Sequence, residues 1–189
     1  MKYDELRIAV IVAIIITSLV GLLLIWVAIT HSHEVVEMGL RDKVEKMVIK
    51  WETGNTPLPL LLTVVQDEGD KLVVGIGHDI LPHDDLELGD TITFYQANYF
   101  LNQDLNQAIK DAYSLLHNAR YYPQDVRAVL ACMCFQLGKA GTSKFKKMFA
   151  AIEAKDYHTA ADEMLNSKWA KQTTRRAQAM ATIMRGAGK

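Results

Sequence analysis

Residues 67–81 read DEGDKLVVGIGHDIL, and this stretch decides the fold. Its strand-like run at residues 72–76 (LVVGI) is preceded by a second apolar run at residues 60–65, and the polar, Gly-containing residues 66–71 separate the two. Two such runs around a polar turn predict a β-hairpin. The segment that follows, residues 79–90, is rich in acidic residues and includes a proline, and it is predicted to form a loop.

Amphipathic helical patterns lie on both sides of this hairpin. Residues 34–52 place apolar and charged side chains at helical spacing, and a Gly- and Pro-containing segment ends that pattern. After the hairpin, helices are predicted at residues 94–116, 123–138, 145–152, 157–165 and 175–184. The order predicts an α+β, mainly helical domain at residues 34–189, with a small β-hairpin lobe (34–90) and a helical lobe (91–189).

The N-terminal region contains the longest apolar run of the chain. Residues 8–30 carry no charged side chain, and as a helix they would extend about 34 Å, enough for a hydrocarbon core of about 30 Å. A cleaved signal peptide has a shorter apolar region and a small-residue cleavage site, and a buried core helix would be shorter or have a polar stripe. Residues 1–33 are therefore predicted to be an uncleaved signal anchor with one transmembrane helix.

Composition excludes several classes of protein. The chain of 189 residues is 50% hydrophobic and has two cysteines, so it is neither disordered nor a disulfide-rich scaffold. The net charge of −1 is a cancellation, because acidic residues predominate in residues 1–90 and basic residues in residues 91–189. The basic half suits an anionic surface such as a cell envelope. Nucleic acid is not an expected partner, because the basic residues form no recognised binding motif.

Two carboxylates are candidates for acid–base chemistry. Glu52 is expected at the C-terminal end of a helix, where burial and the helix dipole favour the protonated acid. Asp67 is expected in the wet hairpin turn, where a carboxylate stays ionised. Two carboxyl groups in contrasting environments are what glycoside hydrolysis requires.

The histidines and cysteines are given structural interpretations. His78 and His83 stand next to aspartates, but their spacing matches no zinc pattern, and a hydrogen-bonding His78 is the favoured alternative. Cys132 and Cys134 are two positions apart on a predicted helix, so they are expected to be buried free thiols. No metal and no cofactor is expected.

Four segments, in order, resemble the phage-type lysozymes of glycoside hydrolase family 24. They are the hairpin segment at 67–81, FLNQDL at 100–105, FQLGKAGTSKF at 135–145, and SKWAKQTTRRAQAMATIMRGAG at 167–188. The likeness covers residues 38–188. It implies the two-lobed phage-type lysozyme fold, preceded here by the predicted transmembrane helix.

The resemblance also implies roles for individual residues. Asp67 stands where the family has its catalytic aspartate, which positions or activates water, and Glu52 occupies the place of the catalytic glutamate in the order of elements. The residues that would bind substrate or support the site are Gly77 in the GIGH segment, the structural His78, the cleft-wall Phe135, the buried partners Gln136 and Trp169, and Arg176 against the glutamate.

The sequence departs from the family pattern at several of these places. The family glutamate lies nine residues before the aspartate, a position held here by Leu58, so Glu52 requires about six extra residues in the loop. Val73 replaces a threonine that helps to hold water. Asp79 and Glu163 replace a leucine and an asparagine that contact sugar. Glu68 is a second candidate beside Asp67.

The expected protein is a membrane-anchored lysozyme that cleaves the β-1,4 bond between N-acetylmuramic acid and N-acetylglucosamine in peptidoglycan. Its expected partners are peptidoglycan glycan strands, the lipid bilayer through residues 8–30, and other membrane or virion proteins. Its domain would face the periplasm or cell wall, from the host inner membrane or a virion membrane. Two alternatives stay open: a non-catalytic peptidoglycan-binding or structural protein on the same fold, and a lytic transglycosylase.

Overall fold

A computed structural model describes residues 2–54, 56–57, 61–67 and 69–188, without the side chains of residues 2–17, 32–33 and 35–36. The chain divides into two compact units, Met1–Gly39 and Leu40–Lys189. The first unit is helical and belongs to α1 (Lys2–Thr53), the helix that also begins the second unit. The predicted division between residues 33 and 34 stays a prediction.

The predicted transmembrane helix is not supported. Among the residues that the structure describes, none of the helices combines the length and the apolar character needed to cross a membrane. The side chains of residues 8–17 lie outside the described residues, and the described remainder of the apolar run, residues 18–30, is shorter than the roughly 20 residues that a span requires. This finding overturns the prediction of a single-pass membrane protein, and with it the bilayer partner at residues 8–30 and the host-membrane or virion-membrane location. The expected membrane or virion protein partners depended on the same anchor.

The hairpin becomes a small antiparallel sheet of three strands. The strands are β1 (Val65–Gln66), β2 (Leu72–Val74) and β3 (His78–Asp79), in the order β1-β2-β3. Val73 pairs with Val65 on one side and with Asp79 on the other. The loop predicted at residues 79–90 therefore begins as a strand, which is too short to produce a periodic pattern.

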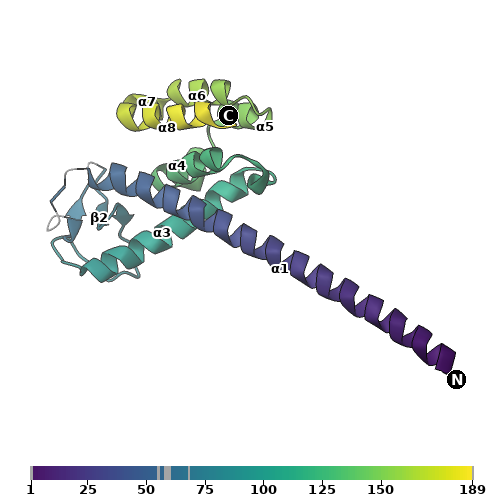
Figure 1. Cartoon of the computed structure of the whole chain (residues 1–189). Helices are drawn as coiled ribbons and strands as arrows, with labels where there is room; N and C mark the ends of the chain where they lie inside the picture. The colour runs from purple at the N-terminus through teal and green to yellow at the C-terminus, as the bar shows by residue number, and fades with distance from the viewer. Residues whose placement is uncertain (1, 55, 58–60, 68, 189) are drawn as a thin grey trace. The chain divides into compact units, whose positions relative to one another are not determined.

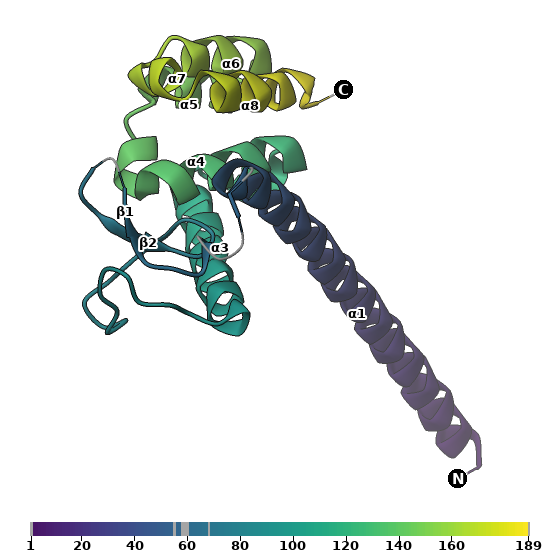
Figure 2. The same cartoon turned by 90° about the vertical axis from the view of Figure 1, so that its left-hand side faces the viewer.

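The rest of the second unit is helical. The helices are α3 (Phe94–Leu115), the 3-10 helix η1 (Ala119–Tyr121), α4 (Gln124–Thr142), α5 (Lys146–Glu153), α6 (Tyr157–Leu165), α7 (Lys168–Gln172) and α8 (Thr174–Gly186). In both views of the chain, the strands lie beside the N-terminal half of α3, and α5–α8 gather together beyond α4 (Figures 1 and 2). A mainly helical fold with a small sheet is confirmed.

Local sequence explains how α3 and α4 begin and bend. Thr93 and Gln96 form a reciprocal capping box at the start of α3, which satisfies two backbone N–H groups that have no partner inside the helix. The predicted end of the next helix at Gly138 is a kink instead. Gly138 has φ 67°, a left-handed conformation that glycine adopts without strain, and the helix resumes to Thr142.

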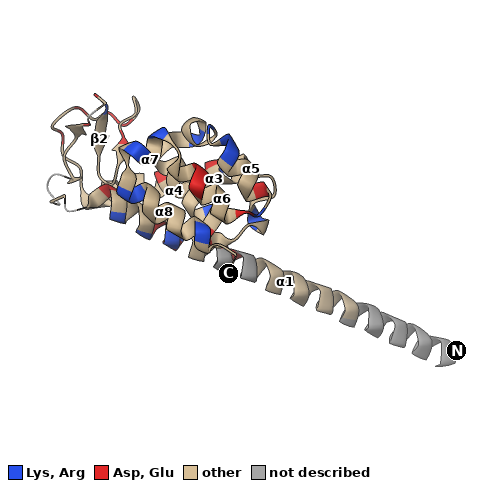
Figure 3. Cartoon of the chain, turned by 90° about the horizontal axis from the view of Figure 1, so that it is seen from above, with Lys and Arg blue, Asp and Glu red and all other residues tan. Residues whose placement is uncertain are grey.

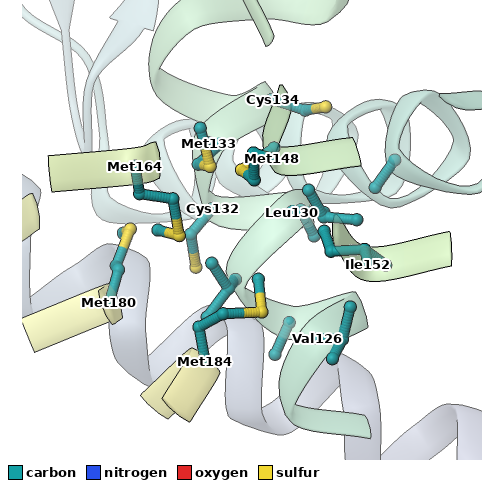
Figure 4. Packing of buried hydrophobic residues seen from close by; sticks show 14 of the residues in the cluster. Val126, Leu130, Cys132, Met133, Cys134, Met148, Ile152, Met164, Met180 and Met184 are labelled. Atoms are coloured by element: carbon teal, nitrogen blue, oxygen red, sulfur yellow. The ribbon is translucent and has the colours of Figure 1, made fainter. Parts of the chain in front are cut away.

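Two apolar clusters of very different size stabilise the second unit. The large cluster joins the C-terminal part of α1 to the helical lobe, and its centre is rich in sulfur: Met133, Met148, Met164, Met180 and Met184 are all buried (Figure 4). Methionine has a flexible side chain that fills irregular gaps between helices. The small cluster consists of Val64, Val74, Ile92 and Ala97 and supports the sheet.

Polar contacts also hold the C-terminal part of α1. The Arg41 guanidinium donates to the side-chain oxygen of Asn102 on α3, and the Lys43 ammonium pairs with Asp125 on α4. Leu40, Val44 and Val48, on the same part of α1, are buried in the large cluster. The C-terminal end of α1 is thus fixed to the helical lobe. This end carries Glu52, so the position of Glu52 is fixed as well.

Candidate active site

Glu52 is held by an arginine from the far end of the chain. It lies one residue before the end of α1, and Arg176 near the start of α8 donates from Nη1 to its Oε1 over 2.8 Å. Both side chains are largely shielded, at 21% exposed for Glu52 and 11% for Arg176. A charge-assisted contact of this length in a shielded setting fixes the orientation of the carboxyl group.

The indole of Trp51 completes this contact. The Arg176 guanidinium carbon lies 5.8 Å from the centroid of the ring, within the range of a cation–π interaction. Trp51 is partly buried against the large cluster. Trp51 is not among the site residues predicted from the sequence, and its position next to Glu52 is the signal that could have added it.

Gly77 allows the turn between β2 and β3 to lie close to the carboxyl group of Glu52. It lies in the turn between β2 and β3 with φ 76°, a conformation that favours glycine. A Cβ atom at this position would lie 3.1 Å from Glu52 Oε2, closer than an ordinary van der Waals contact. The turn can therefore approach Glu52 only because residue 77 has no side chain. The carboxyl group of Glu52 thus has Arg176 bound to Oε1 and the turn at Gly77 on the side of Oε2.

Asp67 is positioned by its own turn. Its Oδ1 accepts hydrogen bonds from the backbone N–H of Gly69 at 2.8 Å and of Lys71 at 2.9 Å. Both donors lie within four residues, an arrangement typical of an aspartate in a polar turn. The side chain is exposed, and among the described residues no hydrogen bond to Oδ2 is recorded. Glu68, the second candidate, and Leu58 lie outside the described residues.

His78 is buried in the strand that follows Gly77. Its Nδ1 lies 2.8 Å from Asp104 Oδ2, its Nε2 lies 3.3 Å from Asp84 Oδ2, and its ring stacks on Phe100 with centroids 4.2 Å apart. Burial opposes a charge on the ring, but the hydrogen bonds and charges of Asp104 and Asp84 outweigh it and raise the pKa of His78. These contacts tie β3 to α3, and the structural role of His78 stays a prediction.

Gln136 and Trp169 form a polar contact inside the helical lobe. The Trp169 indole N–H donates to Gln136 Oε1 over 2.9 Å, and Trp169 is buried. The Phe145 ring meets the Trp169 ring edge-on at 6.0 Å. Phe135, the expected cleft-wall residue, packs partly buried against the large cluster. The pairing of Gln136 with Trp169 is therefore present, as the resemblance implied.

Three residues depart from the family pattern, and the structure describes the surroundings of each. Val73 lies in the centre of the sheet. Asp79 forms an exposed ion pair with Lys71 at 2.6 Å, and the hydrogen bond and charge of Asp79 raise the pKa of the lysine. Glu163 lines a cavity of about 540 Å³ that also includes Trp169.

The two cysteines are buried free thiols, as predicted. Burial raises the pKa of Cys132 to about 12 and that of Cys134 to about 11. Burial thus favours the uncharged thiol over the thiolate, which is the nucleophilic form.

Comparisons with known proteins show the family of this chain. A family model described as phage lysozyme matches residues 60–185. A Dictyostelium discoideum protein named Probable T4-type lysozyme 2 is 28% identical over 160 residues, which cover 73% of this chain and 91% of that protein. Peptidoglycan hydrolase gp36 of Pseudomonas phage phiKMV is 30% identical over 112 residues, which cover 59% of this chain and 12% of that protein.

The family match covers most of the site described above. Asp67, Gly77 and Arg176 lie within the matched residues, whereas Glu52 precedes them. The match extends over two thirds of the chain and includes both the sheet and the helices α3–α7 together with nearly all of α8. This chain belongs to the phage lysozyme family and is a glycoside hydrolase, a muramidase.

Proposed function

We propose that this chain hydrolyses the β-1,4 bond between N-acetylmuramic acid and N-acetylglucosamine in peptidoglycan, with Glu52 as the general acid and Asp67 as the group that activates water. Membership of the phage lysozyme family supports a glycan substrate. A similar phage protein is named a peptidoglycan hydrolase, which supports this polymer in particular.

The observation that carries the proposal is the setting of Glu52. One carboxyl oxygen accepts from Arg176, and the other lies against the turn at Gly77. The Arg176 contact is the one that the resemblance implied for the catalytic glutamate. It supports Glu52 as that residue even though the loop to Asp67 is longer than in the family pattern.

In the proposed reaction, Glu52 transfers its proton to the glycosidic oxygen as the bond from that oxygen to C1 breaks. A water molecule on the opposite face of the sugar forms the new bond to C1 and gives a proton to Asp67. The turn amides bind Oδ1 of Asp67, and among the described residues none donates a hydrogen bond to its Oδ2, which supports this role. Inversion at C1 requires the two carboxyl groups to lie roughly 6.5–9.5 Å apart.

Val73 affects the efficiency of this step. The threonine expected at this position in the family would offer a hydroxyl to the water, and valine has none. We infer that Asp67 orients the water without this second partner, and that turnover is slower than with a threonine.

The catalytic domain is proposed to comprise residues 34–189, with its lobes at residues 34–90 and 91–189.

The test is the digestion of purified peptidoglycan by the full chain, with products identified by mass spectrometry. Hydrolysis adds one water and leaves a reducing muramic acid end, whereas a lytic transglycosylase leaves a 1,6-anhydro end without added water. Glu52→Gln is expected to lower the rate at least a hundredfold. Glu153→Gln, on the exposed end of α5, is the control and should retain the wild-type rate. Anhydro products, or full activity of Glu52→Gln, would overturn the proposal.

A further inference from the structure

The exposed side of α3 carries aromatic rings and carboxamides where a surface helix usually carries charges. Residues 94–109 contain one charged side chain, Asp104, and it binds His78, although 23% of the whole chain is charged. Lys and Arg segments lie instead on helices such as α5 and α7 (Figure 3). We call the uncharged surface of α3 the tyrosine face, and it consists of Tyr95, Tyr99, Gln103 and Asn106.

The members of the tyrosine face share one side of the helix. They follow one another at steps of four, four and three residues, the spacing that keeps side chains on the same face of an α-helix. All four are exposed, whereas Ala97, Leu101 and Leu105 of the same helix are buried. At 1.5 Å per residue the face extends about 16 Å along the axis.

Both tyrosine rings are accessible, and one of them is already fixed in position. Tyr95 is 80% exposed and Tyr99 is 54% exposed. The Tyr99 hydroxyl accepts a hydrogen bond from Gln103 Nε2 at 3.1 Å, and its ring meets the Phe100 ring edge-on with centroids 6.0 Å apart. A ring that is held before binding loses little freedom when a ligand stacks on it.

The carboxamides that flank the face are bound within the protein. Asn102 accepts from Arg41, which also pairs with Glu45 at 3.0 Å. On the other flank, Gln107 donates to Asp111 Oδ1 at 2.9 Å. The face itself therefore offers a ligand two rings and two carboxamides, and none of these groups carries a charge.

This combination of groups matches the chemistry of a sugar. A pyranose ring presents a patch of C–H groups that packs on the face of an aromatic ring, and its hydroxyl and acetamido groups donate and accept hydrogen bonds as carboxamides do. Tyr95 and Tyr99 lie about 6 Å apart along the helix axis, close to the length of one sugar in a β-1,4-linked chain. The two rings can therefore contact neighbouring sugars.

A protein partner, including a second copy of this chain, fits the face less well. A stable interface between two proteins buries about 1,200–2,000 Å² around a largely apolar core. The tyrosine face has no aliphatic side chain, and a dry interface would deprive its carboxamides of water. A narrow, hydrated polymer leaves these groups solvated.

The face and the proposed active site belong to the same compact unit, residues 40–189. Phe100, which contacts Tyr99, also stacks on His78 of β3, and β3 follows the turn that lies close to Glu52. A strand held at the face therefore keeps the catalytic carboxylates near the same polymer. Such tethering raises the effective concentration of substrate at the active site.

We propose that the tyrosine face is a second, non-catalytic glycan-binding site, which holds a β-1,4-linked strand containing N-acetylglucosamine by stacking on Tyr95 and Tyr99. The proposal rests on the proposed function for the polymer that is bound. The site keeps the enzyme on insoluble peptidoglycan between cleavages, and Glu52 and Asp67 have no part in it.

Binding to a polymer that lacks the scissile bond tests the proposal. The probe is an insoluble β-1,4 polymer of N-acetylglucosamine, which contains no muramic acid, and binding of the full chain is measured by co-sedimentation. Initial rates are measured in parallel on insoluble peptidoglycan and on a soluble peptidoglycan tetrasaccharide.

The principal variant is Tyr95→Ala combined with Tyr99→Ala. We expect its affinity for the insoluble polymer to fall about tenfold, as for the loss of two aromatic contacts. Its rate should fall on insoluble peptidoglycan and stay within twofold of the wild type on the tetrasaccharide. Replacing both tyrosines with phenylalanine keeps the ring faces and should preserve binding within about twofold.

The matched control is Tyr121→Ala, compared with Tyr95→Ala alone. Tyr121 is 87% exposed in η1, outside the tyrosine face, so its loss should change affinity for the polymer less than twofold. Tyr95→Ala should lower that affinity about threefold.

Four outcomes would contradict the inference: unchanged binding by the double alanine variant, equal losses for Tyr95→Ala and Tyr121→Ala, a phenylalanine variant as weak as the alanine variant, or tyrosine-dependent self-association without any loss of glycan binding. Failure of the proposed function is a separate result. In that case the wild-type chain would release no reducing ends from peptidoglycan, while binding of the polymer still depended on Tyr95 and Tyr99.

Discussion

The two proposed catalytic carboxylates are held in opposite ways. Glu52 is shielded and fixed by Arg176, a residue more than a hundred positions away, at the edge of the large apolar cluster. Asp67 is exposed and fixed by the amides of Gly69 and Lys71 in its own turn. The acid therefore depends on tertiary packing, whereas the base depends on a local turn supported by the small cluster. Substitutions around Glu52 should consequently have larger effects than substitutions around the hairpin.

Among substitutions that leave both carboxylates in place, Arg176→Ala is expected to have the largest effect. The change leaves a shielded carboxylate without its partner, which should lower the free energy of unfolding by about 2 kcal/mol, and activity should fall tenfold to a hundredfold because Glu52 loses its fixed orientation. Chemical denaturation and initial rates of peptidoglycan cleavage measure the two effects. The control is Arg175→Ala, at an exposed neighbouring position. Equal effects of the two substitutions would show that the Glu52 contact is not the cause.

Gly77→Ala should lower activity less than Arg176→Ala does, and it acts on Glu52 from the turn between β2 and β3. A methyl group at φ 76° is strained by about 1–3 kcal/mol, and it would also press on Glu52 Oε2. Gly89→Ala is the matched control, because Gly89 has φ 91° and no atom within 4 Å of the added methyl group. Both variants should lose stability, but only Gly77→Ala should lose activity at temperatures where both are folded. Comparable losses of activity would argue against a close approach to Glu52.

The next prediction concerns pH and the link between β3 and α3. The pKa of His78 is raised in the folded protein, so protonation of the ring favours folding. This contribution is fully present below the unfolded pKa of about 6.5 and is lost as the pH rises through the folded value. Urea denaturation from pH 5.5 to 8.5 should show a loss of stability that His78→Gln removes. A wild-type profile parallel to that of His78→Gln would contradict the assignment.

The smallest effect is expected for Asp79→Asn. The Lys71–Asp79 pair is well exposed, with side chains 65% and 54% accessible, and such pairs contribute less than about 1 kcal/mol. We expect less than about 0.5 kcal/mol of lost stability and a rate within twofold of the wild type. Thermal unfolding at low and high salt measures the first quantity. A loss of stability or of activity as large as that of Arg176→Ala would contradict the proposed difference between the surroundings of Glu52 and the hairpin.

Much of the helical lobe could be predicted from periodicity. The helix at residues 157–165 has the predicted bounds, and α3 differs from its prediction by one residue. Thr93 and Gln96, which cap α3, stand three residues apart, the spacing of a capping box. Helix α7 was missed because a helix of five residues is shorter than two turns and cannot show a period.

Other features depended on information that one sequence does not contain. The contact of Arg176 with Glu52 joins segments from opposite ends of the chain, so only the family resemblance indicated it. The local pattern near residue 138 predicted an end where the structure has a kink, because a glycine that permits a stop also permits a bend. The apolar run at residues 8–30 predicted a transmembrane helix, and the described residues contain none.

The central claim is that Glu52 donates the proton and Asp67 acts from the other face of the sugar. A crystal structure of the Glu52→Gln variant with a bound peptidoglycan tetrasaccharide tests it most directly. The account predicts the side-chain amide at position 52 within about 2.6–3.2 Å of the scissile glycosidic oxygen, and Asp67 Oδ2 on the opposite face with room for one water. A glycan whose scissile oxygen lies nearer to another carboxylate than to position 52, or Asp67 on the same face, would contradict it.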